Sequence, residues 1–192
     1  ITTFAFTCGA LLITPFVQIY TRGVTDASYY QPLFGYLMMA AEAVYCFRDP
    51  YVNVAYVSGK FRETAAYAYI EAGLNILISA FLVFRFGLVG VAIGTLIAMI
   101  FRMVSHMVYL NNHLIKRPLK SSLKCIGVFF GDVVISSVLV KVFVRFSANN
   151  YFDWVWQAVI TASIVLITML IVSCVFYKKC LSSLIGTILK KK

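Results

Sequence analysis

The chain has 192 residues, of which 61% are hydrophobic and 12% charged, about half the charged share of an ordinary soluble domain. Its formal net charge of +10 would suit a nucleic-acid partner, but the basic residues lie between long apolar runs instead of forming one basic segment. We therefore exclude a soluble domain and a nucleic-acid-binding protein, and we expect a chain whose solvent is the lipid bilayer.

Six apolar runs follow one another along the chain. They cover residues 1–20, 32–56, 64–84, 87–110, 123–144 and 154–177. A helix needs about 20 mostly apolar residues to cross a hydrocarbon core about 30 Å thick. Lipid offers no partners for backbone N–H and C=O groups, and the runs lack the alternation of barrel strands, so each should be a helix. The sequence predicts an all-α transmembrane bundle of six spans, forming a single domain over residues 1–192.

The connections between the runs differ in charge. The second and fourth connections and the tail of residues 178–192 hold most of the 17 Lys and Arg residues. The other connections hold only Arg22, Arg85 and Arg145. The positive-inside rule then places both ends of the chain in the cytoplasm, in a multi-pass protein of the cytoplasmic membrane. The basic excess also favours contact with anionic membrane lipids.

Several features indicate what the chain lacks. It opens at Ile1, already inside an apolar run and without a signal-peptide pattern, so we interpret it as the C-terminal part of a larger protein. No connection is long enough for a catalytic domain, and we therefore do not expect an enzyme. The five cysteines lack metal-site spacing, so neither a metal nor a cofactor is expected.

Gly90 and Gly94 form a GxxxG spacing, which predicts close packing of the fourth helix on a neighbour.

Charged residues inside the spans are costly and usually face a bundle interior or a water-filled cavity. At about 1.5 Å per residue, Glu42 lies ~15 Å from the outer end of its run and Asp132 ~13 Å from the inner end. Arg102 lies ~12 Å and Glu71 ~10 Å from the inner ends of consecutive runs. Arg48 and Asp49 lie in the inner half of the second run, just before Pro50.

Glu71 and Arg102 have similar depths on consecutive antiparallel helices, so we expect a structural ion pair between them. Asn75 and His106 each lie one turn away and extend a polar seam along the same faces. His106 and His113 also lie near the cytoplasmic boundary, where we expect both side chains to be solvated.

Arg48 and Arg102 are also candidates for substrate contact. A guanidinium stays protonated, and its fork of donors matches phosphate oxygens. Facing a shared cavity, the two side chains would suit an anionic pyrophosphate or an acidic sugar.

Glu42 and Asp49 are seven residues apart and share one helical face. With Asp132 they are candidates for coupling transport to protons or sodium, or for lining the cavity. An ordinary interhelical hydrogen-bonding role remains the alternative for Glu42 and Asp49, whereas Asp132 could instead pair with the missing part of the protein.

Three strings carry a resemblance to a known family. They are TPFVQIYTRGVTDASY at residues 14–29, RDPYVNVAYVSGKFRET at 48–64 and YIEAGLNILISAFLVFRFGLVGVAIGTLIAMIFR at 69–102. Together they resemble the C-terminal part of bacterial polysaccharide flippases, within the multidrug/oligosaccharidyl-lipid/polysaccharide exporter superfamily. The resemblance covers about residues 13–117, whereas the last two runs match by hydropathy only.

The resemblance implies a two-bundle exporter, of which this chain supplies the C-terminal bundle. Such flippases move undecaprenyl-pyrophosphate-linked oligosaccharide repeat units to the outer leaflet by alternating access, for capsule, exopolysaccharide or O-antigen synthesis. The implied partners are the lipid-linked oligosaccharide, a polymerase and other assembly proteins. Two alternatives stay open: a cation-coupled drug or small-molecule exporter of the same superfamily, and a membrane-embedded glycosyl or acyl transferase.

Overall fold

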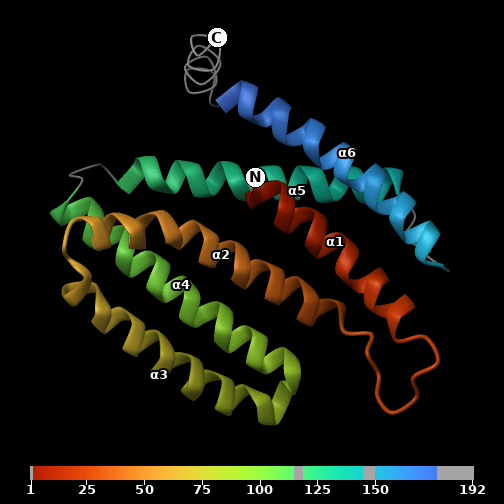
Figure 1. Cartoon of the computed structure of the whole chain (residues 1–192), viewed down its shortest axis with the longest axis horizontal. Helices are drawn as coiled ribbons and strands as arrows, with labels where there is room; N and C mark the ends of the chain where they lie inside the picture. Colours follow the sequence, from red (N-terminus) through yellow and green to blue (C-terminus); the bar gives the residue numbers. More distant parts are fainter. Residues whose placement is uncertain (1, 115–118, 145–149, 177–192) are drawn as a thin grey trace.

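The structure is a computed structural model that describes residues 2–114, 119–144 and 150–176 (Figure 1). Over these residues the predicted all-α class is confirmed. The helices are α1 (Thr2–Tyr20), α2 (Pro32–Val57), α3 (Phe61–Phe86), α4 (Leu88–His113), α5 (Leu119–Phe143) and α6 (Tyr151–Phe176). The predicted basic tail at 178–192 and the basic residues Lys116, Arg117 and Arg145 lie outside the described residues.

Among the residues that the structure describes, five helices are long and apolar enough to cross a membrane: α1, α3, α4, α6 and the Ser122–Phe143 part of α5. Helix α2 is the exception to the six predicted spans. It is as long as α3, but Glu42, Arg48 and Asp49 all interrupt its apolar sequence. Over the described residues the chain is thus a multi-pass helical membrane protein with five candidate spans, and the remaining helix, α2, carries three charged residues in its interior.

Several helices extend beyond the apolar runs that predicted them. Helix α3 begins at Phe61 instead of residue 64, and α4 ends at His113 instead of residue 110. Backbone hydrogen bonding does not stop where apolar side chains stop, because polar residues are equally able to complete a final turn. Glu63 in the first turn of α3 and Arg85 in its last turn also have the signs that the helix dipole favours.

The helices form two groups of three. Helices α2, α3 and α4 pack together, α1, α5 and α6 pack together, and the contact of α1 with α2 is the main link between the groups. Figure 1 shows successive helices running in opposite directions across the bundle. The α2–α3 connection, which contains Lys60, lies at the same end as the start of α5, which contains Lys120 and Lys124. The cytoplasmic placement of that end stays a prediction.

The second group has an apolar core. Leu11 of α1, Val140 and Val144 at the end of α5, and Val165 of α6 are buried together. The indole of Trp154 donates a hydrogen bond of 3.2 Å to the backbone carbonyl of Leu12, which ties the start of α6 to α1.

The close helix packing predicted from Gly90 and Gly94 is confirmed. A Cβ atom at Gly90 would lie 2.6 Å from the carbonyl carbon of Leu82, and one at Gly94 would lie 2.8 Å from the amide nitrogen of Ser79. Both neighbours are backbone atoms of α3, which cannot move aside as a flexible side chain can. Gly87 closes the turn between α3 and α4 with a φ of 56°, a conformation that favours glycine.

Replacing Gly94 with Val should therefore destabilise the protein by about 1–3 kcal/mol, the usual cost of overpacking. The check is thermal unfolding of the detergent-purified protein. Gly73→Ala is the matched control, because a Cβ at Gly73 of α3 meets nothing within 4 Å. Equal unfolding temperatures for Gly94→Val and the control would contradict the close α3–α4 contact.

Candidate functional site

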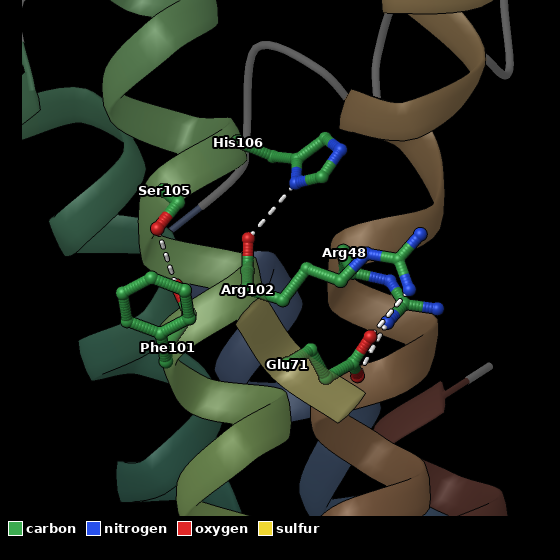
Figure 2. Close-up of polar contacts among 6 residues, drawn as sticks. All are labelled: Arg48, Glu71, Phe101, Arg102, Ser105 and His106. Atoms are coloured by element: carbon green, nitrogen blue, oxygen red, sulfur yellow. Dashed lines mark hydrogen bonds and ion pairs between the residues drawn. The ribbon is translucent and has the colours of Figure 1, made fainter. Parts of the chain in front are cut away.

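Three helices of the first group bring charged side chains together at one place (Figure 2). Arg48 of α2 donates from Nη1 to Oε1 of Glu71 at 3.1 Å, and Arg102 of α4 donates from Nη1 to Oε2 of the same carboxylate. The side chains of Arg48, Glu71 and Arg102 are 7%, 15% and 19% exposed. One glutamate of α3 thus bridges two largely buried arginines, and we call these residues the Arg–Glu–Arg cluster.

The expected contact between Glu71 and Arg102 is present, and Arg48 joins it. Sequence reasoning treated Arg48 only as a separate substrate contact. The positions of the three residues relative to the helix ends could have indicated that Arg48 joins the pair. Counted from the helix ends nearest Lys60, Arg48, Glu71 and Arg102 lie ~14, ~15 and ~17 Å along their helices. Their common depth follows from helix lengths, but the rotation of α2 that turns Arg48 toward α3 does not.

The cluster has more positive charge and more donors than its carboxylate satisfies. It contains two guanidinium groups and one carboxylate. The Nε atoms of both arginines are buried without a hydrogen-bond partner, and a buried unpaired donor costs about 1–3 kcal/mol. The Arg48 guanidinium also lies 4.4 Å from the centre of the Tyr45 ring, a cation–π contact. Such a cluster is chemically suited to bind a further anion.

The polar seam expected between α3 and α4 extends on both sides of the cluster. Toward the α3–α4 turn, Asn75 Oδ1 accepts hydrogen bonds from Ser79 Oγ at 2.9 Å and Thr95 Oγ1 at 3.3 Å. On the other side, His106 Nδ1 lies 3.0 Å from the backbone carbonyl of Arg102. These groups satisfy one another where lipid would offer no partner.

The expectation of solvated histidines holds for His113, which is exposed, but was wrong for His106. The residue is only 1% exposed, and the ring of Tyr67 lies edge-on to it with 5.4 Å between ring centres. The boundary position along α4 was a poor guide, because α3 continues beside α4 at this level and covers the imidazole.

The three acidic candidates do not form one cluster in the described part of the chain. Glu42 and Asp49 are exposed on α2, and Asp49 accepts a hydrogen bond of 3.2 Å from Asn53. Asp132 is buried on α5 and lies 3.5 Å from the hydroxyl of Ser136. In the described residues, no group of three or more His, Cys, Asp or Glu side chains is placed to hold a metal ion.

Asp132 has a polar environment of its own between α5 and α6. The Ser136 hydroxyl lies 2.6 Å from that of Thr168 on α6, and Thr168 donates to the carbonyl of Ile164 at 3.0 Å. Asp132 therefore belongs to a different helix pair from Glu42 and Asp49.

An apolar cavity of about 390 Å³ lies where α1, α2, α4 and α5 meet. Its walls include Phe6, Met39, Phe47, Met103 and Phe129, and no charged residue lines it. Phe47 and Met103 are the chain neighbours of Arg48 and Arg102, so the cavity lies at about the level of the cluster along α2 and α4. The cavity that Arg48 and Arg102 were expected to face is not this one, because neither residue lines it. Its apolar walls could not be predicted, since hydropathy does not distinguish a filled interior from an open one.

Comparisons with protein-family models, with curated proteins and with solved structures gave no match for this chain.

The charge imbalance of the cluster predicts an order of stabilities. Glu71→Gln leaves two like charges buried together and should cost about 3–5 kcal/mol, the usual result of removing one partner from a buried ion pair. Arg48→Met leaves the neutral Glu71–Arg102 pair and should cost clearly less. Thermal unfolding in one detergent measures both variants. An Arg48→Met variant as unstable as Glu71→Gln would show that the cluster is not short of negative charge.

Proposed function

We propose that this chain is part of a flippase that moves undecaprenyl-pyrophosphate-linked oligosaccharide repeat units across the cytoplasmic membrane by alternating access. The observation that carries the proposal is the Arg–Glu–Arg cluster, buried within a multi-pass helical bundle. Its two guanidinium groups stay protonated, and their planar forks match phosphate oxygens. A diphosphate that crosses hydrocarbon needs such groups to replace its water.

The apolar cavity beside the cluster supports an amphiphilic substrate. A lipid-linked diphosphate carries its charge next to a long hydrocarbon chain. The cationic groups of Arg48 and Arg102 and the apolar walls at Phe47 and Met103 occupy successive positions on the same two helices. The chain therefore places a cationic surface and an apolar surface at about the same depth in the bundle.

The family resemblance supports the same substrate class. Its second string begins at Arg48, and its third contains Glu71 and ends at Arg102. The residues of the cluster thus belong to the segments on which the resemblance rests. On this proposal the chain forms the C-terminal bundle of a two-bundle exporter, both of its ends lie in the cytoplasm, and a polymerase and other assembly proteins are its partners.

The alternatives have less support. A cation-coupled drug exporter would be favoured by clustered carboxylates, but Glu42 and Asp49 are exposed on α2 and Asp132 is buried on α5. A membrane-embedded transferase would need a set of polar catalytic groups, and the apolar cavity between α1, α2, α4 and α5 is lined by no charged residue.

Export of surface polysaccharide tests the proposal in cells that make the intact protein. Arg48→Met with Arg102→Met should abolish export, because no guanidinium remains to bind phosphate. Arg48→Lys with Arg102→Lys should retain part of it, because charge survives without the planar fork.

Arg85→Ala is the control, since Arg85 is exposed at the end of α3 and outside the cluster. Immunoblots of the membrane fraction must show equal amounts of every variant. Normal export by the double Met variant would contradict the proposal.

A further inference from the structure

Glu71 occupies the place that an anionic ligand of the cluster would take. Its two carboxylate oxygens each accept a hydrogen bond from a different guanidinium, one from α2 and one from α4. A phosphate group presents similar oxygens to arginine forks. An anion that bound both arginines at these donors would therefore compete with Glu71 for them.

Each arginine has N–H donors that its contact with Glu71 does not use. Each makes its contact with Glu71 through a single Nη1 atom, and both Nε atoms are buried without a partner. A diphosphate has more oxygens and more negative charge than a carboxylate, so it can engage donors that Glu71 leaves unused. The exchange is favourable only for an anion richer in oxygen and charge than the glutamate.

A purely structural role explains this arrangement less well. An ion pair that only holds helices together is most stable when its charges balance and its donors are satisfied. Here Arg102 alone would neutralise Glu71, yet Arg48 is also buried at the same carboxylate with a side chain only 7% exposed. The Tyr45 ring stabilises the charge of Arg48 in part, and a second anion at the cluster would account for the surplus guanidinium and for the unpaired Nε atoms.

We propose that Glu71 is a resident anion, which keeps Arg48 and Arg102 paired while the site is empty and is displaced by the phosphate of the ligand. This inference rests on the proposed function, since it assumes that the two arginines bind the ligand's phosphates. It makes Glu71 a positioning residue that also sets selectivity: weakly charged lipids would fail to displace it.

Displacement also changes how the helices are held. Among the described residues, the Arg48–Glu71 ion pair is the polar side-chain contact between α2 and α3, whereas α3 and α4 share the glycine contacts and the seam at Asn75. Once the ligand takes Arg48 and Arg102, α3 loses its polar tie to α2 and keeps its packing on α4. Ligand binding is thereby coupled to the contact between two helices.

Binding of farnesyl diphosphate to the intact protein in lipid nanodiscs tests the inference. Farnesol is the matched uncharged probe. Glu71→Gln should bind the diphosphate about tenfold more tightly than the unmodified protein, a typical size for two coupled binding events. Glu71→Asp, whose shorter side chain reaches both arginines less well, should fall in between. Farnesol binding should not change.

Glu63→Gln is the control, because Glu63 lies on the same helix but pairs with Lys60 at the exposed end of α3. It should leave the affinity for farnesyl diphosphate unchanged. Tight binding should also slow release, so Glu71→Gln should export less polysaccharide despite its higher affinity. A merely structural glutamate would lower affinity and export together.

The outcomes separate the two proposals. If the unmodified protein prefers farnesyl diphosphate to farnesol but Glu71→Gln binds it equally or more weakly, the displacement idea is overturned and the anion site stands. If neither the unmodified protein nor any Glu71 variant prefers the diphosphate, the anion site itself is wrong. Should Glu71→Gln fail to fold, the comparison of Glu71→Asp with the unmodified protein decides in the same way.

Discussion

Hydrocarbon cannot solvate an ion, so every charge buried in a bundle of this kind must be compensated by another part of the protein. In this chain the compensation is concentrated on one carboxylate. Glu71 lies between Arg48 and Arg102 and thereby joins α2, α3 and α4 at one depth. The packing of the first helix group and the character of its polar interior both depend on this bridge, because either arginine alone would be a buried charge without a counter-ion.

Two different interactions hold α3, and they have different properties. The glycine contacts bring the backbones of α3 and α4 close together and depend on shape alone. The ion pair with Arg48 is electrostatic, and another anion is able to replace it. The first interaction fixes the position of α3 beside α4 and so keeps Glu71 next to Arg102. On our proposal the second is exchangeable, and the ligand would act on it without unfolding the hairpin.

The sequence predicted the helices well because the apolar runs report directly on contact with lipid. It also predicted depth, and from depth the proximity of Glu71 and Arg102. What it lacked was the rotation of each helix about its own axis. Arg48 and Asp49 are neighbours at nearly the same depth, yet the first is buried against Glu71 and the second is exposed.

The rotation of each helix about its axis, which the sequence does not specify, also explains the other differences between prediction and structure. Glu42 and Asp49 do share a face, as their spacing of seven indicated, but that face is exposed in the described bundle. His106 was judged by its distance from the helix end, while its burial depends on α3 beside it. Which neighbour covers a helical face is decided by packing, and a uniformly apolar sequence carries little information about packing.

Gly87 alone connects α3 to α4. Because this connection is so short, the hairpin of α3 and α4 should tilt as a rigid body. Most of α3 is in contact with the surrounding medium, with Ile76, Leu77, Phe81 and Phe84 at 69–89% exposure. Membrane thickness would therefore act on the hairpin first, since helices adapt to hydrophobic mismatch by tilting. Such a tilt would move Glu71 and Arg102 together relative to Arg48 on α2, so the electrostatics of the cluster would respond to the lipid composition around the protein.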